Sequence, residues 1–262
     1  MGSNAMLSRA TSVAAVVSSG QARVSTTRHV QFRVAAPETP SCPSDDGFFV
    51  HLDQNYAVVN KPTNVRLESL AHEPDTPSIE AMVRARLPDL GKFGLVHQLD
   101  IGTSGVLVVG RGKYPCRVAG ALFERRLTRK AYLAVVHGDV GFATKRLPPY
   151  VERRGAPETF LDASYQAALS RCLSALGTDA SAVRECFTVS APIMDQALDH
   201  RVFVAADGKP AQSHAFVLRR GVCHGRNSTE MLLMPVTGRR HQLRAHMQLI
   251  NHPIGMATWC LR

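Results

Sequence analysis

Short apolar runs bounded by glycine, proline and polar residues recur along the chain from about residue 47 to residue 250. Such runs predict buried strands, and apolar positions at helical spacing predict helices. We expect strands at 56–60, 106–109, 131–136, 211–218 and 231–235. We expect helices at about 76–87, 113–126, 165–176 and 237–250. Strands interspersed with single helices in irregular order favour an α+β fold over a doubly wound parallel sheet.

Capping residues mark the ends of two of these helices. Thr76-Pro77 has the character of an N-cap followed by the first helical position, and Pro88 ends the pattern. Thr237-Gly238 is expected to open the last helix, which stops at Asn251.

The N-terminal segment has a different composition from the rest. The first five residues are typical of an expression tag, and residues 6–37 are rich in Ala, Ser, Thr and Val, with arginines but no acidic residue. This composition is typical of a mitochondrial or plastid transit peptide. The alternative is a low-complexity tail or a linker without a targeting role, in which case we expect the protein in the cytoplasm or nucleus. We expect residues 1–46 to be a disordered tag, transit-like segment or linker, and 47–262 to form one folded domain with an insertion at about 142–190.

Charge and composition narrow the class of protein. Lys and Arg exceed Asp and Glu by ten, which favours a polyanionic partner, most plausibly nucleic acid. A basic organellar protein without such a partner is the alternative. No apolar run approaches the ~20 residues of a membrane helix. The six cysteines form no C-x-x-C pair, so neither a zinc knuckle nor a redox dithiol is expected.

The segment His97–Gly105 carries a single carboxylate on a turn rich in glycine and hydroxyl residues. Apolar runs lead into and out of it, so Asp100 is expected at a sheet edge with its geometry set by two buried strands. A turn aspartate that caps its own backbone is the alternative interpretation.

Two later segments also place unusual residues next to predicted strand ends. Alternation along the strand after Arg129 puts Lys130 and Tyr132 on one face. In the segment 235–246, a glycine turn leads into a helix whose first turn holds two arginines, a histidine and a glutamine. A helix N-terminus already favours anions, so these arginines predict a phosphate-binding corner.

Taken together and in this order, the three segments resemble motifs of the RluA-type pseudouridine synthases. Members of that family typically show a His-Arg-Leu-Asp turn followed by Thr-Ser-Gly, a Lys-x-Tyr strand and a Thr-Gly-Arg-x-His-Gln-Ile/Leu-Arg segment. Two further matches are 59–62 (Val-Asn-Lys-Pro) and 207–211 (Asp-Gly-Lys-Pro-Ala). The resemblance runs from about 48 to 253 and implies a mixed, largely antiparallel sheet flanked by helices.

The resemblance implies an enzyme that isomerises uridine in RNA to pseudouridine after flipping the base. Asp100 would be the catalytic carboxylate, which either attacks the sugar or takes a proton from it, and both roles remain open. Tyr132 would lie against the flipped uracil, and Arg244 would pair with the carboxylate. The resemblance implies these substrate-binding residues: Lys61, His97, Gln98, Thr103, Lys130, Arg239, Arg240, His241 and Gln242.

Among these residues, four basic side chains would neutralise phosphates: Lys61, Lys130, Arg239 and Arg240. His97 also fits a purely structural hydrogen-bonding role. The resemblance implies neither a metal nor an organic cofactor, and it implies RNA (ribosomal, transfer or messenger) as the partner of a monomer.

Two departures from the family pattern motivate alternative functions. Gln98 stands where many members have arginine, and the sequence diverges after Pro253, so that one interpretation is a missing last strand. A catalytically weak or inactive RNA-binding protein that keeps the fold is therefore a second hypothesis. A hydrolase that uses His241 or His246 with Asp100 is a third.

Overall fold

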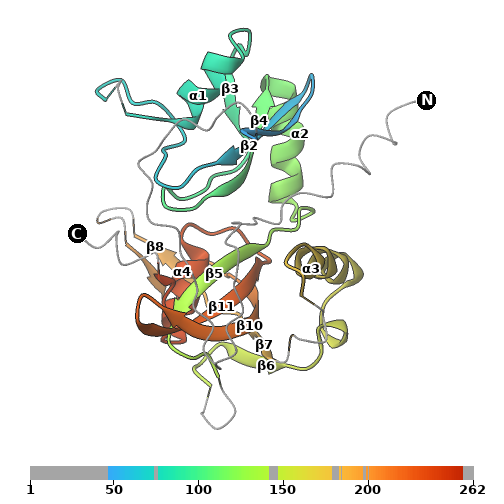
Figure 1. Ribbon diagram of the computed structural model, residues 1–262, viewed down its shortest axis with the longest axis vertical. Coiled ribbons are helices and arrows are strands. Elements are labelled where there is room, and N and C mark those ends of the chain that lie inside the picture. The colour runs from blue at the N-terminus through green and yellow to red at the C-terminus, as the bar shows by residue number, and fades with distance from the viewer. Residues whose placement is uncertain are drawn as a thin grey trace. The chain divides into compact units, whose positions relative to one another are not determined.

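The computed structural model describes residues 47–73, 76–141, 147–178, 183, 185–196, 199 and 201–255. These residues divide between Thr128 and Arg129 into two compact units, which we call the N-terminal unit and the C-terminal unit (Figure 1). The segment 1–46, with its expected tag or transit-like character, lies outside the described residues, as do residues 256–262 with the divergent C-terminus.

The N-terminal unit contains a four-stranded antiparallel sheet with the order β1-β2-β4-β3. Its strands are β1 (Phe49–Leu52), β2 (Tyr56–Lys61), β3 (Phe93–Leu95) and β4 (Gly105–Arg111). Helices α1 (Ile79–Arg86) and α2 (Lys113–Glu124) complete it. Apolar residues of β2, β4 and α1 form its core, among them Val59, Leu107 and Ile79, which are fully buried.

Helix α1 begins two residues later than its sequence signal predicted. Ser78 is the N-cap, because its backbone is extended and its hydroxyl accepts a hydrogen bond from the amide of Ala81. The predicted cap, Thr76, instead donates its hydroxyl to Glu73 at 3.3 Å. The helix ends at Arg86, before Pro88, as predicted.

The C-terminal unit contains a five-stranded antiparallel sheet with the order β5-β11-β10-β7-β6. Its strands are β5 (Tyr132–His137), β6 (Val151–Arg154), β7 (Glu185–Val189), β10 (Ser213–Cys223) and β11 (Arg226–Pro235). A separate hairpin joins β8 (Ile193–Asp195) to β9 (Val202–Val204).

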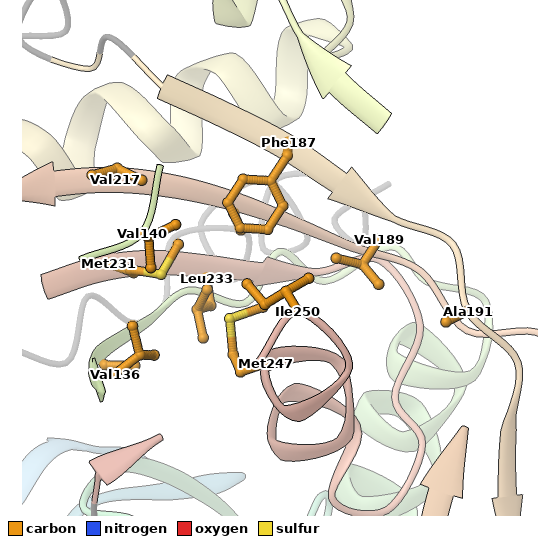
Figure 2. Packing of buried hydrophobic residues seen from close by; sticks show 12 residues of the cluster. Val136, Val140, Phe187, Val189, Ala191, Val217, Met231, Leu233, Met247 and Ile250 are labelled. Atoms are coloured by element: carbon orange, nitrogen blue, oxygen red, sulfur yellow. The ribbon is translucent and has the colours of Figure 1, made fainter. Parts of the chain in front are cut away.

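Both faces of this sheet are covered. On one face, Met231 and Leu233 of β11 pack with Met247 of helix α4 (Gln242–Leu249), as Figure 2 shows. On the other face, Leu232 and Met234 belong to a cluster with helix α3 (Ala163–Ala175). Successive side chains of a strand point to opposite faces, so this continuous apolar run is buried on both sides.

The segment 142–190 supplies parts of the main sheet. It contains β6, the short 3-10 helix η1 (Pro157–Thr159), α3 and β7. The short helix predicted at 165–176 is confirmed by α3, whereas the two strands had no clear sequence signal.

The last helix begins later than predicted. Its first residue is Gln242, and His241 is the N-cap with a left-handed backbone (φ 50°). The two arginines at 239 and 240 therefore lie in the loop before α4, and the prediction that they occupy its first turn is wrong. The helix ends at Leu249, and Asn251 follows in a left-handed conformation, as its role as a stop signal predicted.

The described elements confirm the predicted α+β class, with helices packed on antiparallel sheets. No described helix has the length and apolar character that crossing a membrane requires. Within the described ranges, no group of three or more His, Cys, Asp or Glu side chains is placed to hold a metal ion.

Candidate active site

Asp100 lies in the loop that connects β3 to β4, and two of its neighbours anchor that loop inward. The ring of His97 stacks on the ring of Phe123 in α2 with centroids 4.8 Å apart, and its Nε2 accepts a hydrogen bond from the amide of Val108 at 3.1 Å. Leu99 packs against the core of the N-terminal unit. These contacts fix the backbone on both sides of Asp100, and Asp100 itself is half-buried.

Lys61 holds the same loop from the inside of the unit. Its side chain is fully buried, and its Nζ donates to the carbonyl oxygens of Pro62, Ile101 and Thr103 at 3.0, 2.9 and 2.8 Å. Burial lowers the pKa of Lys61 to about 8, and the negative charge of Asp100 opposes this shift. A phosphate contact, the role predicted for Lys61, would require the ammonium to leave these three carbonyls.

The segment that follows Lys61 adds backbone contacts to the Asp100 loop. The amide of Asn64 donates to the carbonyl of Ile101 at 2.8 Å, and the hydroxyl of Thr63 donates to the carbonyl of Gly102 at 3.1 Å. Sequence reasoning missed these contacts, because they depend on the register in which Lys61 pairs with Gly105 at the start of β4, and that register is seen only in the folded sheet.

In the C-terminal unit, Tyr132 is the first residue of β5 and lies opposite Leu233 of β11. It is half-buried and packs against the cluster that includes α4. Lys130 precedes the strand, and its Nζ donates to the carbonyl of Thr237 at 3.4 Å. A Cβ added at Gly238 would lie 3.1 Å from that Nζ, so the absence of a side chain at 238 leaves room for the lysine.

Gln242 fixes the loop before α4. Its Oε1 accepts hydrogen bonds from the hydroxyl of Thr237 at 2.7 Å and the amide of Arg239 at 3.0 Å. Its Nε2 donates to the carbonyl of Gln212 and the hydroxyl of Ser213, both at 2.9 Å. The side chain is buried and uses all four positions of its amide inside the protein. A substrate contact, as predicted for Gln242, would have to replace one of these bonds.

His246 is engaged in the same network. It is fully buried, its Nε2 lies 3.0 Å from the carbonyl of Ala191, and its Nδ1 lies 3.1 Å from the hydroxyl of Ser213. A carbonyl only accepts, so Nε2 carries the proton and Nδ1 accepts from the hydroxyl. Burial lowers the pKa of His246, although the bond to Ala191 acts in the opposite direction, and the lowered pKa favours the neutral ring. This histidine has no nitrogen left to act as the base of a hydrolase.

Three predicted basic residues surround the start of α4. Arg239 is half-buried, and its Nε donates to the carbonyl of Pro210 at 3.2 Å. Arg240 is exposed and forms an ion pair with Asp195 of β8 at 2.8 Å. Arg244 lies in the first turn of α4 and is half-buried. Positive charge is therefore concentrated at the N-terminal end of a helix, which itself favours anions.

The predicted site residues fall into two groups, one on each compact unit. The N-terminal unit brings together the first group: Lys61, His97, Gln98, Asp100 and Thr103. The C-terminal unit carries the second group: Lys130, Tyr132, Arg239, Arg240, His241, Gln242 and Arg244.

Comparisons with known proteins show what this chain is similar to. The model of a family described as RNA pseudouridylate synthase matches residues 55–249. An RNA pseudouridylate synthase domain-containing protein 1 of Danio rerio is 30% identical over 216 residues, which cover 79% of this chain and 61% of the relative. The dual-specificity RNA pseudouridine synthase RluA of Vibrio vulnificus is 28% identical over 203 residues, which cover 77% of this chain and 64% of the relative.

A solved structure shows the same likeness. The structure of human RNA pseudouridylate synthase domain containing 1 matches with a TM-score of 0.55 and 25% sequence identity, over 83% of this chain and 69% of that chain. The chain spans a little under two thirds of the length of the two curated relatives named above.

Proposed function

Since this chain belongs to the RNA pseudouridylate synthase family, we propose that it converts uridines in RNA to pseudouridine. The observation that carries the proposal is the Asp100 loop, where the backbone around the half-buried Asp100 is held by inward-facing neighbours and by a buried ammonium. A reacting group needs this kind of fixed geometry, whereas a turn aspartate that only caps its backbone does not.

The reaction exchanges one bond to the sugar for another. The bond between N1 of uracil and C1′ of ribose breaks, the base turns, and C5 bonds to C1′ and loses its proton, while N1 gains one. Asp100 acts in its ionised form, either as the nucleophile at the sugar or as the base that removes a sugar proton. The buried Lys61 ammonium attracts this carboxylate, since Asp100 in turn raises the pKa of Lys61.

The remaining residues are assigned by the resemblance and by their contacts. We propose that Tyr132 stacks on the displaced uracil and that Arg244 is the cation that pairs with the catalytic carboxylate. Lys61, His97 and Gln242 are positioning residues, because each uses polar atoms in hydrogen bonds inside the protein.

Six residues are proposed to contact the RNA directly. Gln98 is exposed on the Asp100 loop, and Arg240 is exposed before α4. The group consists of Gln98, Thr103, Lys130, Arg239, Arg240 and His241. Their cations would neutralise phosphates of a polyanionic partner, which agrees with the surplus of ten basic residues in the chain.

Release of tritium from uracil C5 tests the proposal. Total RNA labelled with tritium at C5, from cells that lack the gene, is the substrate, and pseudouridine maps of cells with and without the protein identify the target uridine. The wild-type protein releases tritium, and Asp100→Asn lowers kcat at least about a thousandfold because the carboxylate charge is lost.

Asp89→Asn is the matched control, since Asp89 is an exposed carboxylate of the same unit, and it keeps wild-type turnover. Full turnover by Asp100→Asn would refute the assigned role. RNA binding by the wild-type protein without tritium release would instead support the non-catalytic RNA-binding hypothesis.

A further inference from the structure

Ile101 follows Asp100 directly and exposes 52% of its surface to solvent. Single exposed apolar residues are common and by themselves mean little. Ile101 differs from the ordinary case in two respects, the rigidity of its backbone and its place beside the carboxylate.

The backbone of Ile101 is held on both sides. Its carbonyl accepts hydrogen bonds from the Lys61 ammonium at 2.9 Å and from the amide of Asn64 at 2.8 Å. The amide of Thr103 closes the turn by donating to the carbonyl of Asp100 at 3.0 Å. The isoleucine side chain is therefore kept outward by contacts that are already formed, and presenting it to a ligand costs little further ordering.

The loop also separates anchoring side chains from outward ones. His97 and Leu99 are directed inward, onto Phe123 and the core, whereas Gln98 and Ile101 are exposed. Consecutive Cα atoms are about 3.8 Å apart, so a nucleotide bound at Asp100 brings the adjacent part of its strand close to Ile101.

We propose that Ile101 is an apolar wedge that packs against the base next to the target uridine while that uridine is out of the stack. This inference rests on the proposed function and deepens it. A flipped nucleotide leaves the face of its neighbour without a stacking partner, and isoleucine is one of the side chains that proteins insert at such steps.

A base is the occupant that fits this residue. One isoleucine is far smaller than the apolar area that a stable protein interface buries. A base face matches it in size, and the basic chain attracts RNA. Because Ile101 lies beside the catalytic carboxylate, the base that it contacts belongs to the nucleotide next to the reacting one.

Three variants test the wedge on an RNA oligonucleotide that contains the mapped target uridine. Ile101→Ala lowers kcat/KM for tritium release about tenfold, the order seen when a stacking side chain is truncated. Ile101→Leu stays within about twofold, because it keeps the apolar surface. Val50→Ala removes a similarly exposed β-branched side chain (58%) from β1 of the same unit and leaves kcat/KM unchanged.

An abasic neighbour separates base packing from a structural role. The wild-type protein and Ile101→Ala are compared on oligonucleotides in which the base on one side or the other of the target is replaced by an abasic site. On one of the two, the tenfold difference shrinks to within about twofold, because the base that Ile101 contacts is absent. A distortion of the loop would persist on every RNA.

Each outcome decides between the proposals. An Ile101→Ala variant as active as wild type on intact RNA, or equally impaired on both abasic RNAs, overturns the wedge and leaves the proposed function standing. A wild-type protein that releases no tritium from any RNA overturns the proposed function and the wedge with it.

Discussion

The buried ammonium of Lys61 ties together two parts of the chain that are far apart in sequence. It bonds to the carbonyls of Ile101 and Thr103, on either side of a glycine in the Asp100 loop. Hydrogen bonds from a charged donor contribute about 1.5–3 kcal/mol each. Burial lowers the pKa of Lys61 to about 8 in spite of the attraction of Asp100, so the protein retains a buried cation whose polar partners are these carbonyls.

Lys61→Met is expected to lower the free energy of unfolding by about 1–4 kcal/mol, because the carbonyls of Pro62, Ile101 and Thr103 lose their donor inside the protein. Urea denaturation followed by circular dichroism measures it. Lys92→Met, at an exposed lysine of the same unit, changes the free energy of unfolding by less than about 0.5 kcal/mol.

The same variant distinguishes a positioning role from a phosphate contact. Turnover of Lys61→Met falls at least about tenfold because Asp100 loses its fixed position, while RNA affinity changes less than about twofold. A loss of affinity with unchanged turnover would restore the phosphate role that the sequence predicted.

Helix α4 and the loop before it depend on one internal amide. Gln242 links the loop residues Thr237 and Arg239 to the start of β10 through four hydrogen bonds. A buried network of this kind specifies one conformation only while every member is satisfied.

Gln242→Glu is expected to lower the free energy of unfolding by about 2–4 kcal/mol. The carboxylate cannot donate to the Gln212 carbonyl, and it brings a charge into a buried position. Gln248→Glu is the matched control, because Gln248 is exposed on the same helix, and its effect stays within about 0.5 kcal/mol. Equal effects of the two variants in urea denaturation would show that the network contributes little.

The sequence predicted the secondary-structure elements better than their ends. Strands with continuous apolar runs and helices with a clear periodicity lie where they were expected. The predicted start of α1 was wrong because Thr76 and Ser78 are both capping residues, and only the extended backbone at Ser78 selects between them. The first half of β11, from Arg226 to Glu230, was missed because its residues are polar, although Ser228 and Thr229 are buried.

The site was predicted as a set of residues given by the family resemblance, and internal contacts favour another role for three of them. Sequence alone does not show that Lys61 is fully buried, that His97 bonds to the amide of Val108 or that Gln242 is bound on all sides. The division of the twelve predicted residues between two compact units likewise had no sequence signal.

At the scale of the whole molecule, the number of phosphates that its cations neutralise sets how RNA binding depends on salt. Each phosphate neutralised by a Lys or Arg releases counterions, so affinity falls as a power of the salt concentration. With three cations proposed at phosphates, Lys130, Arg239 and Arg240, RNA affinity is expected to fall about 20- to 40-fold between 50 and 200 mM salt. Arg239→Gln lowers the slope of log affinity against log salt by about one.

Arg171→Gln is the control for this measurement. Arg171 is exposed on α3, and its Nε bonds to the carbonyl of Ala167 within the helix, so the salt slope stays unchanged if α3 does not contact RNA. An equal decrease for both variants, measured by fluorescence anisotropy with one RNA, would show a general charge effect rather than a contact at Arg239.

The burial of β11 on both faces has a consequence for how the chain finds its strand alignment. A slip of one residue would exchange Met231 and Leu233 with Leu232 and Met234, apolar for apolar, so side-chain polarity discriminates poorly between neighbouring alignments. The two-residue connection between Cys223 and Arg226 supplies what the side chains do not, since His224 and Gly225 both adopt left-handed backbones, as the tight hairpin turn requires. The register of β10 and β11, the longest strands in this sheet, is therefore set by the two-residue turn between them, His224 and Gly225.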